Sequence, residues 1–271
     1  MITKNQLLKE IEALGIKPDD TLMVHSSMKS IGEVDGGADT VLGAFIEYMK
    51  PGLLVFPTHT WKLIANDRIV FHPETDPSCV GVLSNLFLKR PGVKRSLHPF
   101  ESVGALGTGA EDFISGEECR DTPCAREGCY GKLYDRKAKI LFLGCSMSKN
   151  TFLHGVEEWN HIANRLTDEP RNCKTELADG RLLDCPVRFC QSPIGDISVN
   201  YGKMELPFLL TGIALKGKIG NAVSVLCDAV LMADLTSFLL SKNPDLFLDS
   251  NPVPIDQVEE WLKNGKPSLT Y

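Results

Sequence analysis

The 271-residue sequence lacks the short patterns that most directly assign a function. It contains no C-x-x-C pair, no G-x-x-x-x-G-K-[ST] phosphate loop, no G-x-G-x-x-G fingerprint, no H-E-x-x-H motif and no G-x-S-x-G pentapeptide. Their absence argues against a P-loop or dinucleotide-binding protein, a zinc metalloprotease and a serine hydrolase with a nucleophile elbow.

Long apolar runs are also missing. No run approaches the roughly 20 residues that span a bilayer, and the opening "MITKNQLLKEIEAL" has an amphipathic helix pattern without the apolar core of a signal peptide. The formal net charge of −6 argues against a nucleic-acid backbone as partner. We therefore expect a cytoplasmic protein with no membrane and no nucleic-acid partner.

The nine cysteines indicate free thiols, because their number is odd and cytosolic disulfides are rare. Cys119, Cys124 and Cys129 are spaced by five, whereas zinc knuckles bring ligands roughly two to four residues apart. We expect no metal. Cys145 follows an apolar strand, where it is either a nucleophile or, more commonly, a buried thiol.

Helix and strand patterns alternate through the first half of the chain. Short apolar strands are predicted at 21–25, 53–58, 101–107 and 139–145, with helices at 3–14, 36–52 and 80–92. This alternation predicts an α/β fold with a mainly parallel central sheet and helices on both faces.

The second half adds an antiparallel element. Asp179-Gly180 lies between alternating runs in 173–189 and predicts a β-hairpin. Helices return at 228–242 and 255–264. No linker or repeat interrupts the chain, so we expect one domain, 1–271.

Ligands bind such folds beyond the carboxyl ends of the strands. That rule selects the segments 25–37, 58–61, 95–99 and 146–154, and it places His25, His59 and His154 directly after apolar strands. The Gly-rich segment 25–37 either binds phosphate or amide oxygens through its backbone or is a plain strand–helix connection.

His154 and Glu157 lie three residues apart at the start of a predicted helix, so they share one face. The helix dipole disfavours an imidazolium there, and a neutral imidazole is what a general base needs. Glu157 could orient the ring. Packing of the histidine behind the sheet is an equally good explanation of the spacing alone.

Four stretches, in order, carry a family resemblance. They are "LMVHSSMKSIGEVDGGADTVLGAFIEYMKPGLLVFPTHTW" (22–61), "FHPETDPSCVGVLSNLFLKRPGVKRSLHPFESVGALG" (71–107), "GKLYDRKAKILFLGCSMSKNTFLHGVEE" (131–158) and "KGKIGNAVS" (216–224). Together they resemble the aminoglycoside 3-N-acetyltransferase (antibiotic N-acetyltransferase) family over nearly the whole chain.

The resemblance implies an acetyl-coenzyme A-dependent transfer directly to an amine, on a fold distinct from the GNAT acetyltransferases and without metal. It makes His154 the base, with Glu157 and Asp196 as catalytic carboxylates. Coenzyme-binding residues implied by it are His25, Ser26, Ser27, Ser30, Gly36, Gly37 and Thr151. Substrate-binding residues are Thr58, His59, Trp61, His98 and Glu205.

Two stretches depart from the family pattern. Members usually carry an acidic residue in a late G-x-A-E-S stretch, where this chain has Val223, and a P-F-G-x-x-S-P loop, where it reads "PCAREGCYG" (123–131). The acceptor is therefore either an aminoglycoside or a related amino sugar.

Two further hypotheses for the function stay open: an acyltransferase for a non-antibiotic amine in a biosynthetic pathway, and a coenzyme-binding protein without turnover. We expect a small-molecule amine as partner and a homodimer as the candidate assembly.

Overall fold

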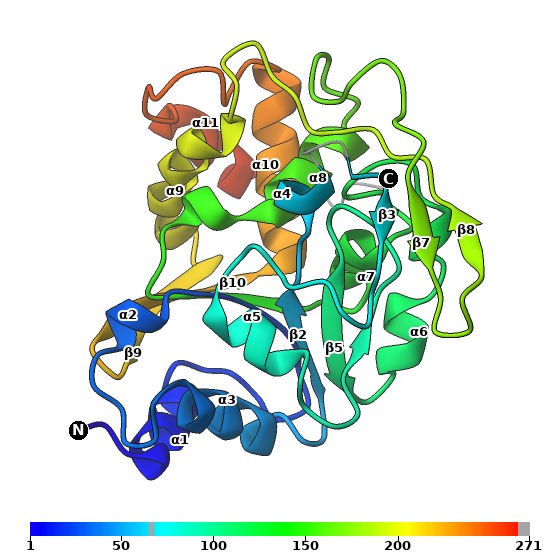
Figure 1. Cartoon of the computed structure of the whole chain (residues 1–271). Coiled ribbons are helices and arrows are strands. Elements are labelled where there is room, and N and C mark those ends of the chain that lie inside the picture. The colour runs from blue at the N-terminus through cyan, green and yellow to red at the C-terminus, as the bar shows by residue number, and fades with distance from the viewer. Residues whose placement is uncertain (65–67, 265–271) are drawn as a thin grey trace.

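A seven-stranded mixed sheet runs through the centre of the protein (Figure 1). The structure is a computed structural model that describes residues 1–64 and 68–264. The strands lie in the order β4 (Lys94–Arg95), β5 (Val103–Gly107), β2 (Leu53–Pro57), β1 (Thr21–Ser26), β6 (Lys139–Leu143), β10 (Ala222–Asp228) and β9 (Ala214–Ile219).

The parallel part of the sheet is its centre. β1 pairs parallel with β2 and β6, whereas β5 and β4 on one side and β10 and β9 on the other are joined antiparallel. The α/β class is confirmed, but the sheet is less parallel than predicted. Strands buried on both faces are apolar throughout in either direction, so their sequence does not reveal their direction.

Alternate residues of the central strands enter two cores. Met23, Val55 and Phe142 face one layer, and Leu22 and Leu54 face the other. The first layer contains α6 (Ala110–Ile114), α7 (Cys129–Asp135), α8 (Thr151–Trp159), α9 (Glu205–Leu210), α10 (Ala229–Lys242) and α11 (Ile255–Lys263). The opposite layer contains α1 (Lys4–Ala13), α2 (Met28–Ile31), α3 (Gly37–Tyr48) and α5 (Val82–Phe87). Helices thus cover both faces, as predicted (Figure 1).

Local signals set several helix ends. The Thr3 hydroxyl accepts the Gln6 amide at 3.3 Å, which caps α1, and Gly15 follows that helix at φ 94°. Asp228 caps α10 by accepting from Leu231 N at 3.0 Å. Within the described ranges, no helix has the length and apolar character that crossing a bilayer requires.

A small second sheet carries the predicted hairpin. It contains β3 (Val70–Phe71), β7 (Lys174–Glu176) and β8 (Leu182–Asp184), with β7 and β8 antiparallel and Asp179-Gly180 in the turn between them. The remaining elements are α4 (Trp61–Ile64) and the 3-10 helices η1 (Glu117–Cys119), η2 (Met147–Lys149) and η3 (Ile197–Met204). α4, η2 and η3 contribute residues to the cavity described below.

Close packing around Gly131 in α7 fixes the neighbouring Tyr130. A Cβ atom at Gly131 would lie 1.6 Å from the carbonyl oxygen of Arg126. We expect Gly131→Ala to lower the free energy of unfolding by about 3 kcal/mol, because backbone must move to admit the methyl group. Urea denaturation measures this change. Gly202→Ala is the matched control: its Cβ meets nothing within 4 Å, so a change below about 0.5 kcal/mol is expected. Equal stability of the two variants would contradict the packing argument.

Candidate active site

A cavity of about 860 Å³ opens at the carboxyl edge of the parallel strands. β1, β2 and β6 end at this edge, and β5 begins there because it runs antiparallel to β2. The three histidines that follow apolar strands therefore meet in one place. The predicted site residues that line the cavity are His25, Ser26, Ser27, His59, Trp61, Thr151, His154 and Asp196.

The segment after β1 contributes only its first residues to the cavity wall. Ser30 lies behind Ser27 and donates a hydrogen bond to its hydroxyl at 3.0 Å. Gly36 and Gly37 adopt φ values of 72° and 63°, so they form the turn into α3, away from the cavity lining. Their glycine identity follows from this left-handed backbone.

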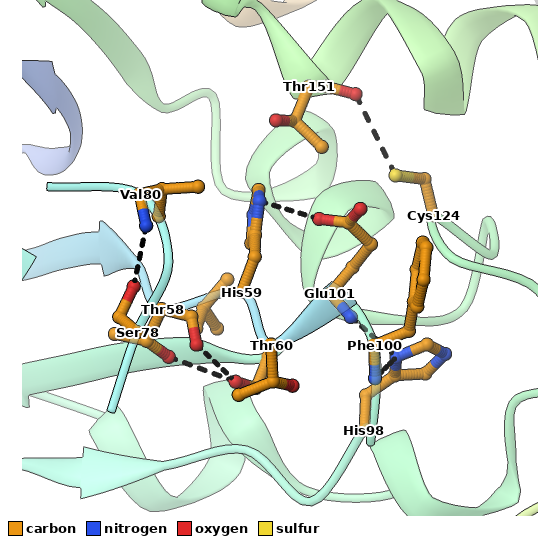
Figure 2. A network of polar contacts seen from close by, with 12 residues as sticks. Thr58, His59, Thr60, Ser78, Val80, His98, Phe100, Glu101, Cys124 and Thr151 are labelled. Carbon is orange, nitrogen blue, oxygen red and sulfur yellow. Dashed lines mark hydrogen bonds and ion pairs between the residues drawn. The ribbon is translucent and has the colours of Figure 1, made fainter. Parts of the chain in front are cut away.

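Three residues predicted to bind substrate lie outside the cavity lining. Thr58 is buried with its hydroxyl 3.1 Å from Ser102 Oγ. His98 Nδ1 accepts the backbone amides of Phe100 and Glu101 at 3.2 and 2.9 Å, and burial lowers the pKa of His98 to about 4. These contacts shape the turn that presents Glu101 (Figure 2).

Glu205, the third of these residues, begins α9. Its carboxylate pairs with Lys216 Nζ on β9 at 2.7 Å. The neighbouring strand β10 carries Val223, which is 51% exposed and also outside the cavity lining. Asp196, in contrast, lines the cavity at the start of η3, where its Oδ1 accepts from the amide and hydroxyl of Ser198 at 3.0 and 2.6 Å.

α8 delivers His154 to the cavity. Phe152, Val156 and Trp159 recur at helical spacing and pack into the core, which leaves His154 free to line the cavity in the first turns of the helix. Asn150 precedes α8, but its side chain makes no capping bond; Nδ2 lies 3.3 Å from Met232 Sδ instead.

Behind His154 lies a chain of buried polar groups. His154 Nδ1 is 2.9 Å from the Tyr201 hydroxyl, and that hydroxyl donates to Glu157 Oε2 at 2.5 Å. Glu157 Oε1 accepts from Arg165 Nε at 2.5 Å, with the two side chains 1% and 5% exposed. Glu157 thus reaches His154 through Tyr201 and lies outside the cavity lining.

The chain fixes the tautomer of His154. Tyr201 has one hydroxyl proton, which it donates to Glu157, so its oxygen accepts from His154 Nδ1–H. Nε2 then keeps its lone pair. Burial lowers the pKa of His154, while Glu157, Glu101 and Asp196 act in the opposite direction. The arrangement leaves a neutral imidazole with one free basic nitrogen.

A second histidine system also contributes to the cavity lining, through His59 and Glu101 (Figure 2). His59 Nδ1 lies 2.7 Å from Glu101 Oε2, and His59 Nε2 lies 2.8 Å from the Tyr130 hydroxyl. Burial raises the pKa of Tyr130 well above its usual value, so the phenol keeps its proton and can donate it to Nε2. His59 therefore has both nitrogens engaged, whereas His154 has one engaged through Tyr201.

Burial makes Cys145, Cys124 and Cys129 poor nucleophiles. Cys145 lines the cavity, but burial raises its pKa to about 12. Burial also raises the pKa of Cys124 and Cys129 well above the usual range, and their sulfurs face the carbonyl oxygens of Thr151 and Phe113. Among the described residues, no group of three His, Cys, Asp or Glu side chains is arranged to hold a metal ion.

Sequence reasoning missed Tyr201, Arg165, Glu101 and Tyr130. Tyr201 lies 47 positions from His154, and no local pattern links the two. Tyr130 stands in the stretch 123–131 that departs from the family pattern, so that departure was its only signal. Glu101 follows the selected 95–99 segment, but it also begins the predicted strand 101–107, and that position carries no sign of a role in the site.

Comparisons with known proteins identify the family and the fold of the chain. A sequence profile described as aminoglycoside 3-N-acetyltransferase matches residues 23–241. Aminoglycoside N(3)-acetyltransferase IV of Salmonella sp is 32% identical to this chain over 183 residues. The match covers 66% of this chain and 66% of that relative, so the chain spans just under two thirds of the relative's length.

Solved structures share the fold. A mutant of aminoglycoside acetyltransferase AAC(3)-IVa in complex with a gentamicin superposes with a TM-score of 0.78 at 26% identity, covering 91% of each chain. AAC-IIIb, described as a binary structure with CoASH, has a TM-score of 0.77 at 23% identity, covering 93% of this chain and 99% of the other.

The Arg165–Glu157 pair supports both the site and the fold. Arg165→Met leaves a buried carboxylate without its cation, so we expect the free energy of unfolding to fall by about 3–5 kcal/mol. Chemical denaturation measures the loss. The control, Lys4→Met, breaks the exposed pair with Glu47 and should cost no more than about 1 kcal/mol. If both variants lost the same small amount, the buried pair would not have the structural role assigned to it.

Proposed function

Because the chain belongs to the aminoglycoside 3-N-acetyltransferase family, we propose that it transfers an acetyl group from acetyl-coenzyme A to an amine, with His154 as general base. The observation that carries this proposal is the orientation of His154, whose Nδ1 is engaged by Tyr201 while the side chain lines the cavity. The free Nε2 is the atom that would accept the proton of the acceptor ammonium.

The proposed reaction is a direct transfer. The ammonium loses a proton to His154 Nε2, and the amine nitrogen then attacks the thioester carbonyl carbon. A C–N bond forms, the C–S bond breaks, and the coenzyme leaves as its thiol. Tyr201 and Glu157 support the imidazolium that forms, because the Tyr201 oxygen accepts from Nδ1–H and Glu157 polarises that hydroxyl. No cysteine is needed as nucleophile, in keeping with the raised pKa of Cys145.

The donor side of the cavity has groups that suit coenzyme A. Ser26 at the end of β1 and Ser27 directly after it line the cavity, as do Lys62 and Lys149. Hydroxyls and ammonium groups are suitable partners for pantetheine amides and phosphates. Thr151 and His25 complete the proposed coenzyme wall; His25 stacks on Phe142 at 5.3 Å, and burial lowers its pKa to about 3, so it stays neutral.

A second candidate is an acyltransferase for a non-antibiotic amine. The replacement of the family's acidic residue by Val223 favours it. A coenzyme-binding protein without turnover is less well supported, because the connection His154–Tyr201–Glu157–Arg165 is complete. Thiol release from acetyl-coenzyme A with a panel of amines separates the three candidate functions. Release with aminoglycoside drugs supports the first, and release with other amines only supports the second. Release with no amine supports the coenzyme-binding protein.

His154→Ala should lower the turnover rate at least about 100-fold, the usual contribution of a general base. Thiol release with a saturating amine measures the rate, and circular dichroism checks the fold. His72→Ala is the matched control, since His72 pairs with Glu176 on the small sheet, outside the cavity lining. A folded His154→Ala protein with a near-normal rate would refute the assignment of the base.

Tyr201→Phe should slow turnover about tenfold to 100-fold and move the acid limb of the rate profile to lower pH, because the imidazolium loses the acceptor of its Nδ1–H. In the parent protein, activity should be full above the pKa of His154 and fall as pH drops through it, with a midpoint below 6.5 because burial lowers that pKa.

The control for Tyr201→Phe is Tyr48→Phe, which removes a hydroxyl that donates to Ile16 O at 2.7 Å on the opposite layer. A rate and a pH profile unchanged in Tyr201→Phe would exclude Tyr201 as a positioning residue.

A further inference from the structure

Glu101 is a buried carboxylate without a cation. It lines the cavity and is only 7% exposed. Among residues 1–64 and 68–264, no lysine or arginine pairs with it, whereas the buried Glu157 has Arg165 as its partner. A buried negative charge is costly when no countercharge accompanies it. A positively charged ligand is therefore the group that this part of the cavity is suited to receive.

His59 contacts the carboxylate of Glu101 and, as a neutral ring, adds no countercharge. His59 Nδ1 lies 2.7 Å from Glu101 Oε2, and Figure 2 shows the two side chains pointing toward one another. Because Tyr130 can donate its hydroxyl proton to Nε2, a neutral ring carries its single hydrogen on Nδ1. The contact is close but is not aligned as a hydrogen bond, so Oε2 is a buried acceptor without a donor. The ring thus lies against the carboxylate and leaves its charge to a ligand.

The backbone around Glu101 is held in place. The Glu101 amide donates to His98 Nδ1 at 2.9 Å, and the hydroxyl of the next residue, Ser102, donates to Thr58 O at 2.8 Å. Both contacts lie directly before β5. A charged group that is already ordered loses little conformational entropy when its partner binds. Glu101 is therefore better suited to recognise a ligand than a carboxylate on a freely rotating side chain.

Glu101 also lies within electrostatic reach of His154. Burial lowers the pKa of His154, and the carboxylates that raise it are Glu157, Glu101 and Asp196. Glu157 is paired with Arg165. Asp196 is an exposed residue, so water and salt screen its charge. Glu101 is thus the buried and unpaired negative charge near the proposed base.

We infer that Glu101 binds the ammonium group of the acceptor and holds it for His154, with His59 as a positioning residue. The inference rests on the proposed function and adds a substrate-binding residue that the family resemblance did not indicate. In the proposed reaction the positive charge passes from the ammonium to the imidazolium, so Glu101 attracts it throughout. This attraction is common to the bound acceptor and to the transition state, and it therefore strengthens acceptor binding more than it raises the turnover rate.

Glu101→Gln tests the inference, because it keeps the size of the side chain and removes its charge. With gentamicin as acceptor and saturating acetyl-coenzyme A, we expect KM for the amine to rise at least about tenfold and kcat to change less than about threefold. KM for acetyl-coenzyme A should stay unchanged. Calorimetry on the coenzyme A-loaded protein should show the same rise in Kd for gentamicin, and circular dichroism checks the fold.

Glu176→Gln is the matched control, because Glu176 pairs with His72 on the small sheet, outside the cavity lining. It should leave both KM and Kd for gentamicin unchanged. An unchanged KM and Kd in Glu101→Gln, a loss confined to kcat, or an equal rise in the control overturns the inference.

Asp196→Asn compares an exposed carboxylate with the buried one. Since solvent screens the charge of Asp196, this variant should raise KM for gentamicin less than Glu101→Gln does. A larger effect of Asp196→Asn would assign the ammonium to Asp196 and overturn the inference.

The inference and the proposed transfer fail separately. If His154→Ala loses turnover while Glu101→Gln behaves like the parent protein, the transfer stands and the role of Glu101 is wrong. If no amine is turned over, the transfer is wrong and calorimetry decides: weaker binding of gentamicin by Glu101→Gln supports the role of Glu101, and equal binding overturns it. Glucosamine replaces gentamicin as the probe where the parent protein binds no gentamicin, and binding of neither amine overturns the inference.

Discussion

The buried ion pair between Arg165 and Glu157 is the interaction on which the candidate site depends. A carboxylate that is 1% exposed would be costly without a cation, and Arg165 supplies one at 2.5 Å. The paired carboxylate then accepts the hydroxyl proton of Tyr201, and this direction of donation decides which nitrogen of His154 bears hydrogen. The Arg165–Glu157 pair lies outside the cavity, and it thereby decides that Nε2 of His154, inside the cavity, is the nitrogen that can accept a proton.

The geometry of the sheet explains why one cavity collects so many polar groups. Three parallel strands end at the same edge, and the antiparallel strand β5 begins there, so the chain supplies residues to this edge from four neighbouring strands. His25 and His59 come from strand ends. Glu101 comes from a strand beginning, which a wholly parallel sheet would have placed at the opposite edge.

The two histidine systems differ in a way that fits separate roles. His59 lies between Glu101 and Tyr130, with both ring nitrogens engaged. His154 is held from one side only. A ring held from both sides is suited to shaping a binding wall and to orienting Glu101, whereas a ring held from one side keeps a nitrogen for proton transfer. We therefore regard His59 as a positioning residue in the proposed reaction.

The sequence by itself determined the α/β class, most of the helices and strands, the hairpin at Asp179-Gly180 and the edge at which His25, His59 and His154 meet. These follow from local periodicity, from turn residues and from the rule that ligands bind beyond strand carboxyl ends. Spacing alone left His154 and Glu157 undecided between packing and catalysis.

Only the tertiary structure decided how His154 and Glu157 are connected. Tyr201 and Arg165 reach Glu157 from 44 and eight positions away, and no periodic pattern encodes such contacts. The same holds for strand direction and for Thr58, His98 and Glu205, whose sequence positions suggested a binding role although their side chains turn to other partners. Local sequence determines which residues form a helix, a strand or a turn. The direction of a strand within the sheet and the partner of a polar side chain depend on segments that only folding brings together.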